Sequence, residues 1–266
     1  MNMPKIEYQK IIDAMKGKSV DRPNRANAGT LSGHAAGEPF EKCVLAELRK
    51  QYPGKIFKQY EFLNDLFMKH PKHITLEDKY ALIESPTAQF LLSRGDSATS
   101  QWTPEKMFEE RQSDTADILY VQRGFYNIID VKTRNLDKNA QPPNIISAYK
   151  LAQMCAYMIE NEEYDSISID YIGIDWREDK ENGKLVCEGA QHVCLFKIQP
   201  DDLYINWAAA LQVQFHPHTA SQSWEGNTEE WARGYLRHFV DSARKRCDTM
   251  RAKFIDPFLK YIDEAG

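Results

Sequence analysis

Hydrophobic residues in the first part of the chain recur with the period of an α-helix. The pattern predicts a short helix near residues 11–15 and helical structure over most of residues 58–94. Residues 22–37 are polar and contain three glycines, so we expect a loop there. Pro39 is then expected to open a longer helix. The apolar face of that helix comprises Phe40, Val44, Leu45 and Leu48.

From Ile118 onward the hydrophobic period changes from about 3.6 to 2, which is typical of β-strands. Residues 117–121 and 126–132 alternate in this way and are separated by residues 122–125, a hairpin signal. Further alternation predicts additional strands of one mixed sheet, at residues 166–176, 184–187, 193–198 and 211–215.

Two more helices are expected in the second half of the chain. One follows Asn144, with Ile145, Tyr149, Ala152, Cys155 and Ile159 on one face. The other is a long C-terminal helix over about residues 228–255, capped by Asn227 and ended or kinked by Pro257. The order of helices, hairpin, helix, strands and helix predicts an α/β (α+β) fold, with a mixed central sheet flanked by helices.

Composition narrows the class of protein. The chain has 266 residues, of which 42% are hydrophobic and 27% charged, and no linker or repeat divides it, so we expect one domain over residues 1–266. It contains no long apolar run and no secretory signal, so no membrane partner is expected. Five cysteines without a CxxC pair indicate a reducing cytoplasm. A net charge of −5 argues against a protein that coats nucleic acid, but leaves room for a local basic cleft.

The hairpin carries the residues that could perform chemistry. If Arg123 and Gly124 form a two-residue turn, the ladder places Asp117 directly opposite Asp130. Lys132 lies two residues further along and therefore on the same face as Asp130. Like charges that face each other across two strands repel, so the pair needs a compensating cation.

A divalent metal such as Mg²⁺ is the simplest cation for this pair, because it prefers oxygen ligands. The chemistry that suits two carboxylates, a metal and Lys132 is hydrolysis of a phosphodiester. The spacing alone is equally consistent with a structural role, in which Asp117 and Asp130 end their strands at a solvated edge and Lys132 neutralises them. A bulge in the turn would also remove the facing geometry.

Asp117, followed after twelve residues by Asp130-Val131-Lys132, resembles the PD-(D/E)xK nuclease signature. The surrounding segments resemble more specifically the HincII family of type II restriction endonucleases, over about residues 29–261. These segments are SGHAAGEPFE (32–41), DTADIL (114–119), DVKTRN (130–135), PNIISAYKLAQ (143–153) and LYINWAAA (203–210).

The resemblance implies a role for each matching residue. Asp117 and Asp130 would bind the metal, and Lys132 would complete the catalytic set. Gln141 would wedge into the DNA stack, and Asn144 and Asn206 would read base edges. If the resemblance is set aside, the sequence favours structural roles for these three residues. Gln141 would be an exposed loop residue, Asn144 a helix N-cap and Asn206 a turn residue.

Other residues near these motifs have weaker cases. Thr133, Arg134 and Tyr204 are candidates for DNA contacts, with solvated charges as the alternative for the basic residues. Glu41 is expected to support the metal site from the first long helix, or to be surface charge. Asp96 departs from the family pattern, which puts a backbone contact from its loop in doubt.

The resemblance implies a Mg²⁺-dependent enzyme, with Mn²⁺ able to substitute, that cuts double-stranded DNA at GTYRAC to leave blunt ends with 5′-phosphates. It further implies a homodimer, a DNA methyltransferase in the same restriction–modification system, and a bacterial cytoplasmic location. The alternatives are a sequence-specific DNA-binding module without catalysis and a PD-(D/E)xK repair or structure-specific nuclease. The base-reading set outside the core motif favours restriction.

Overall fold

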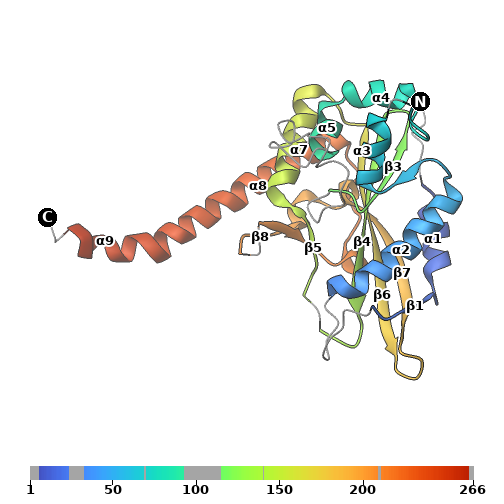
Figure 1. Cartoon of the computed structure of the whole chain (residues 1–266). Coiled ribbons are helices and arrows are strands. Elements are labelled where there is room, and N and C mark those ends of the chain that lie inside the picture. Colours follow the sequence, from blue (N-terminus) through green and yellow to red (C-terminus); the bar gives the residue numbers. More distant parts are fainter. Residues whose placement is uncertain are drawn as a thin grey trace.

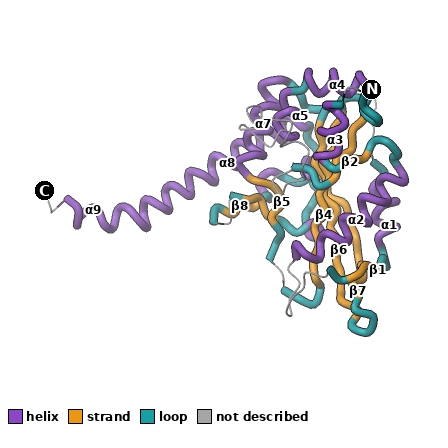
Figure 2. The backbone as a smooth tube through the Cα atoms, in the orientation of Figure 1, coloured by secondary structure: helices purple, strands orange, loops and turns teal. Residues whose placement is uncertain are grey.

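The computed structural model of the chain describes residues 6–23, 33–68, 70–92, 115–139, 141–208 and 211–263. Helices surround a central sheet, and a long C-terminal helix runs away from it (Figures 1 and 2). The α-helices in these ranges are α1 (Tyr8–Met15), α2 (Gly33–Gln51), α3 (Gln59–Phe67), α4 (Leu76–Ile83), α5 (Pro86–Leu92), α7 (Ala148–Asn161), α8 (Thr228–Met250) and α9 (Asp256–Asp263).

Within the described ranges, six strands form the main sheet in the order β1-β7-β6-β4-β3-β2. Only the pair β4–β6 is parallel among them, so the sheet is mixed, as predicted. The strands are β1 (Ser19–Asp21), β2 (Ile56–Phe57), β3 (Ile118–Gln122), β4 (Phe125–Asn135), β6 (Ile167–Asp179) and β7 (Lys184–Cys194).

The hairpin between β3 and β4 has the predicted register. Gln122 pairs with Phe125, and Ile118 pairs with Ile129 at the other end of the ladder. Arg123 and Gly124 form the turn with φ values of 51° and 74°, which is the left-handed geometry of a type I′ turn. This turn matches the natural twist of the strands, so the two-residue connection fixes which residues face each other.

The main sheet is covered on both faces, which explains the nearly continuous burial of β3 and β4. One face packs against α1 and α2 through strand residues such as Ile129 and Ile172. The opposite face packs against α3, α5, α7 and the start of α8 through Ile128 and Tyr171. Figure 1 shows α1 and α2 on one side of the strands and α3, α5 and α7 gathered around their upper end.

The prediction of one sheet was wrong. Within the described residues, β5 (Asn144–Ser147), β8 (Tyr204–Asn206) and β9 (Gln212–Gln214) form a separate small sheet in the order β5-β9-β8. The helix expected directly after Asn144 begins later, at Ala148, where the Ser147 side chain accepts from Lys150 N. The β-branched pair Ile145–Ile146 is buried in the strand against β9, so pairing outweighs the helical period.

Two further boundaries differ from the predictions. Residues 184–187 and 193–194, predicted in two separate strands, belong to the single strand β7, which continues through a bulge at Glu188. The rest of the second predicted strand is not β-structure, because a 3₁₀ turn follows at Leu195–Lys197. The bulge hides the alternation, because one extra residue shifts the period. Helix α2 starts at Gly33, so Pro39 lies inside it instead of opening it.

Helix α8 is anchored at its start and exposed at its end. Asn227 caps it as predicted, accepting from Glu230 N at 2.8 Å. Trp231 Nε1 donates to the Ile198 carbonyl at 2.8 Å, and the Tyr235 hydroxyl donates to the Ala148 carbonyl at 3.0 Å. Beyond these anchors, α8, a π-helical turn (Arg251–Ile255) and α9 project from the body as an arm (Figure 1). No helix in the described ranges is long and apolar enough to cross a membrane.

Asp65 provides a test of how the α3 region is held. Its buried carboxylate accepts from the backbone N–H groups of Lys72, His73 and Ile74 at 2.8–2.9 Å. Burial alone would raise the pKa of Asp65, but these hydrogen bonds outweigh it and lower the pKa. A lowered pKa stabilises the fold above the ordinary range of a carboxyl group, and this stability is lost as the pH falls towards the folded value.

We therefore expect Asp65→Asn to lower the free energy of unfolding by about 1–3 kcal/mol at pH 7, because the amide cannot accept the same three bonds. Urea unfolding at several pH values would show the difference shrinking as the pH falls below about 4. The control Asp13→Asn, at an exposed position, should change little. Equal losses for Asp65→Asn at pH 7 and pH 3.5 would contradict the ionic role of the carboxylate.

Candidate active site

The hairpin register brings the predicted carboxylates together. Asp117 directly precedes β3, and Asp130 lies in β4 one residue beyond Ile129, the partner of Ile118. Asp130 is 9% exposed and Asp117 is half-buried, so water reaches the pair only in part. Burial and the charge of Asp130 raise the pKa of Asp117 to about 8. The two groups therefore cannot both ionise at neutral pH without a cation beside them.

Lys132 supplies one cation to this pair. Its Nζ lies 2.5 Å from Asp130 Oδ2. Burial alone would lower the pKa of Lys132, but the negative charges of Asp130, Asp117 and Glu41 outweigh it and raise the pKa. Lys132 is thus an ammonium group at neutral pH, a hydrogen-bond donor and not a base.

The carboxylates also fit a divalent metal. Asp130 Oδ1 is buried and has no hydrogen-bond partner, although Oδ2 is paired with Lys132. A buried carboxylate oxygen without a partner is costly, and a hard cation such as Mg²⁺ would satisfy it together with Asp117. Among the described residues no group of three or more His, Cys, Asp or Glu side chains is arranged as a metal site. The remaining ligands would be backbone carbonyls, water or phosphate oxygens, which Mg²⁺ accepts.

A buried glutamine holds the backbone that leads into Asp117. Gln59, at the start of α3, is 1% exposed. Its Oε1 accepts from Thr115 N at 2.9 Å and from Ala116 N at 3.0 Å, while its Nε2 donates to the Leu92 carbonyl at 2.8 Å. The side chain therefore fixes the position of Asp117 through the two residues before it.

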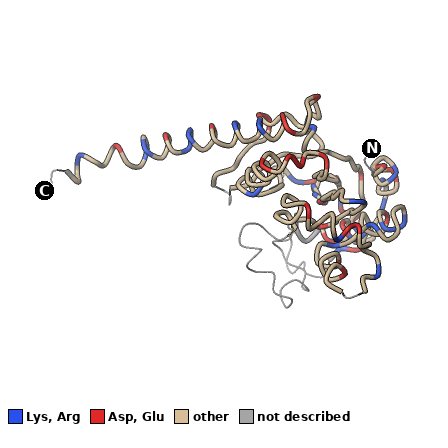
Figure 3. The backbone as a smooth tube through the Cα atoms, turned by 90° about the horizontal axis from the view of Figure 1, so that it is seen from above, with Lys and Arg blue, Asp and Glu red and all other residues tan. Residues whose placement is uncertain are grey.

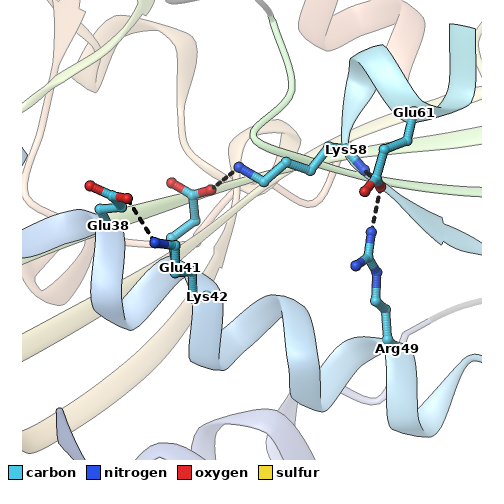
Figure 4. A network of polar contacts seen from close by, with 6 residues as sticks. All are labelled: Glu38, Glu41, Lys42, Arg49, Lys58 and Glu61. Carbon is cyan, nitrogen blue, oxygen red and sulfur yellow. Dashed lines mark hydrogen bonds and ion pairs between the residues drawn. The ribbon is translucent and has the colours of Figure 1, made fainter. Parts of the chain in front are cut away.

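The predicted supporting residue, Glu41 of α2, lies beside the site in an ion pair. Lys58 Nζ lies 2.9 Å from Glu41 Oε1, and Figure 4 shows the two side chains pointing toward each other between α2 and α3. The charge of Glu41 contributes to the raised pKa of Lys132, and the charge of Lys58 acts on Asp117 in the opposite sense to Asp130. This ion pair adds a second cation and a third carboxylate to the electrostatic surroundings of the site.

The small sheet brings the predicted base-reading asparagines into one row. Asn206 Nδ2 donates to Gln214 Oε1 at 3.0 Å, and Gln214 Nε2 donates to Asn144 Oδ1 at 2.7 Å. Asn206 Oδ1 accepts from the backbone N–H of Ala208 at 3.0 Å. The interpretation of Asn144 as a helix N-cap is wrong, because Asn144 opens β5 and Ser147 caps α7.

The other predicted DNA contacts differ in their surroundings. Gln141 is exposed, directly ahead of β5, and Tyr204 at the start of β8 is 62% exposed. Thr133 follows Lys132 on β4 and faces Gly37 of α2. A Cβ atom added to Gly37 would lie 3.9 Å from the Thr133 hydroxyl oxygen. Arg134 forms two hydrogen bonds with Asp175, of 2.8 and 2.7 Å, so a phosphate would have to share its guanidinium group with Asp175. Asp96 lies outside the described residues.

Three residues of this region were not predicted from the sequence: Gln59, Lys58 and Gln214. Gln214 stands between buried Val213 and Phe215, so the period of 2 predicts that its side chain points away from the core. Its hydrogen-bond partners, Asn206 and Asn144, could not be predicted in this way. Lys58 and Gln59 carry no local signal, because their partners lie on other elements.

Together, a mixed sheet with two carboxylates and a lysine at a β-hairpin, and a row of side-chain amides on a separate small sheet, are the features of a nuclease-like site. The family model "Restriction endonuclease HincII" matches residues 11–262. The chain is 53% identical over 262 residues to the Type II restriction enzyme HindII of Haemophilus influenzae (strain KW20 / Rd) and, at the same identity and length, to the Type II restriction enzyme HincII of Haemophilus influenzae. Each match covers 98% of this chain and 100% of the relative. The chain belongs to the HincII family of restriction endonucleases.

The carboxylate pair makes metal binding measurable without DNA. We expect millimolar Mg²⁺ or Ca²⁺ to raise the thermal midpoint, because a cation that relieves the repulsion between Asp117 and Asp130 binds the folded state preferentially. Asp130→Asn should remove most of this increase, whereas Asp175→Asn, on β6, should keep it. An unchanged metal-induced shift in Asp130→Asn would exclude Asp130 as a ligand.

Proposed function

We propose that this chain is a type II restriction endonuclease that hydrolyses phosphodiester bonds of double-stranded DNA with Mg²⁺, for which Mn²⁺ can substitute. The observation that carries the proposal is the facing pair Asp117 and Asp130 with Lys132 beside it, in a chain of the HincII family. Asp117 and Asp130 would hold the metal, because the two carboxyl groups are close together and Lys132 leaves the buried Asp130 Oδ1 without a partner.

Each catalytic residue then has a distinct task. Bound Mg²⁺ would polarise the scissile phosphate and lower the pKa of a bound water. Lys132, protonated because of its acidic neighbours, would donate a hydrogen bond to the attacking water or to a phosphate oxygen. The Glu41–Lys58 pair would keep the positive and negative charges around Lys132 balanced. Attack in line would leave a 3′-hydroxyl and a 5′-phosphate.

Recognition would come from the region around the small sheet. Asn144 and Asn206 are suited to base edges, since an Asn side chain can form two hydrogen bonds with adenine. Gln141 is exposed directly before β5 and would act as a wedge beside a pyrimidine–purine step, which unstacks at low cost. We propose GTYRAC as the target, cut at its centre to leave blunt ends. Tyr204, Thr133 and Arg134 would contribute contacts to the sugar–phosphate backbone.

We further propose a homodimer, since one active site per chain cuts one strand and a palindromic target matches a two-fold axis. The C-terminal arm supports this proposal, because its large apolar side chains are 40–67% exposed. They are Val240, Met250, Phe254, Ile255, Phe258, Leu259, Tyr261 and Ile262. Figures 1 and 3 show the arm reaching well beyond the body, where a second copy would meet it.

The charges on the arm indicate that it packs against the body of the second copy and not against the arm of that copy. Val240, Ala243, Cys247, Met250 and Phe254 follow the 3-4 spacing of a coiled-coil seam. The flanking positions carry only cations: Arg244, Arg246, Arg251 and Lys253. Two such arms side by side would repel each other, whereas a less basic protein surface would not.

A restriction enzyme requires protection of host DNA, so we propose a partner DNA methyltransferase of the same specificity in a bacterial cytoplasm. The two proteins share a recognition sequence and need no direct contact.

Cleavage tests the proposed function directly. A plasmid incubated with the protein and Mg²⁺ should give discrete fragments whose sequenced ends are blunt within GTYRAC, and EDTA should prevent cutting. Asp130→Ala should abolish cleavage, because half of the metal site is lost, but should still bind the site in Ca²⁺. Fragments ending at another sequence would refute only the specificity. DNA binding without cleavage in any divalent metal would refute the enzyme.

The arm provides a test of the dimer. Light scattering at micromolar concentration should give twice the mass of one chain, and Phe254→Asp with Phe258→Asp should give one chain mass with unchanged helical content. Thr249→Asp adds a carboxylate to the polar side of the same arm and should leave the dimer intact. A wild-type monomer, or a dimer that tolerates both Phe substitutions, would contradict this use of the arm.

A further inference from the structure

The row of side-chain amides in the small sheet has a fixed direction. Amide groups can usually be reversed, because oxygen and nitrogen exchange places with little change in shape. Here the row ends on a group that cannot be reversed. The backbone N–H of Ala208 can only donate, and Asn206 Oδ1 lies 3.0 Å from it.

This backbone group fixes the orientation of each amide in the row in turn, from Asn206 through Gln214 to Asn144. Since Asn206 Oδ1 faces Ala208, Asn206 Nδ2 points to Gln214 and must meet an acceptor there, which is Gln214 Oε1. Gln214 Nε2 then points the other way and must meet Asn144 Oδ1, at 2.7 Å. One backbone N–H, in the turn that follows β8, thus determines which end of the Asn144 amide faces the sheet.

The group presented outward is the Nδ2 of Asn144. Asn144 is exposed, and among the residues that the structure describes its Nδ2 has no hydrogen-bond partner. An outward N–H donor suits base atoms that accept, such as N7 of a purine, while the second lone pair of Oδ1 can still accept from an adenine amino group. A reversed amide would present its oxygen first and favour base amino groups instead.

We propose that Gln214 is a specificity-determining positioning residue, which transmits the direction of the Ala208 N–H to Asn144 and so sets the base that Asn144 selects. This inference rests on the proposed function, in which Asn144 reads a base edge. Gln214 itself acts through Asn144.

A purely structural role for Gln214 makes a different prediction. The small sheet already has backbone pairing along β9 on both sides, and Val213, Ile205 and Ile146 are buried beneath it. These contacts hold the strands together without the amide row. If Gln214 only added stability, its replacement would lower the thermal midpoint and leave base preference unchanged.

The experiment compares cleavage of short duplexes in which each base pair of the recognition site is replaced in turn. Gln214→Glu keeps the size of the side chain but can only accept at neutral pH. It would accept from Asn206 Nδ2 as before and force Asn144 to turn its Nδ2 inward. We expect the cleavage-rate ratio between the best and the substituted site to change on the order of ten- to a hundredfold at one base pair, and little at the others.

Two further variants separate the possible causes. The leucine of Gln214→Leu makes no hydrogen bond and cannot fix the orientation of the Asn144 amide. The cleavage-rate ratio at the base pair affected by Gln214→Glu should therefore fall, and no new base should be preferred there. Gln222→Glu serves as a matched control, since Gln222 also joins two groups, Cys194 N and the His192 carbonyl, but lies outside the small sheet. The added negative charge of Gln214→Glu weakens binding to all duplexes alike and cancels in the ratios.

The outcomes distinguish this inference from the proposed function. If wild-type protein cuts no short site, the proposed function fails first. If wild type and Gln214→Glu both cut with the same profile, the inference is overturned while the function stands. Should Gln214→Glu fail to fold, as judged by circular dichroism, Gln214→Leu decides: full discrimination in that variant would equally overturn the role of Gln214.

Discussion

Repulsion between Asp117 and Asp130 is the constraint around which the rest of this protein is arranged. A type I′ turn and a two-sided core force the two carboxylates into the same small volume. The fold tolerates this because Lys132 is held against Asp130 and because the Glu41–Lys58 pair adds balanced charge nearby. What is left uncompensated, Asp130 Oδ1, is the place at which a metal would gain most. Packing in the core and the separation of like charges therefore make opposite demands on the same pair of residues.

The catalytic face was predictable because its geometry is local. A two-residue turn and strict alternation determine the register of Asp117, Asp130 and Lys132, and the structure has that register. The metal-binding and DNA-reading roles of these and the other site residues stay predictions until they are measured. Burial of the pair could not be predicted, because it depends on helices that lie far away in the sequence.

The region around Asn144 shows where local patterns fail. Ile145 and Ile146 fit both a helical face and a strand, and only pairing with β9, nearly seventy residues later, decides between them. The same long-range pairing puts Gln214 between Asn144 and Asn206. Lys58 and Gln59 were missed for a related reason, since a lysine or glutamine at the start of a helix has no pattern that identifies its distant partner.

Gln59 has one more consequence, for how this protein can change over time. Its amide joins the end of α5 at Leu92 to Thr115 and Ala116, which lead into Asp117, so one buried side chain connects two places that lie far apart in the sequence. Replacement of this one side chain would release both places at once, so we expect Gln59 to vary less between related sequences than a glutamine at an exposed position.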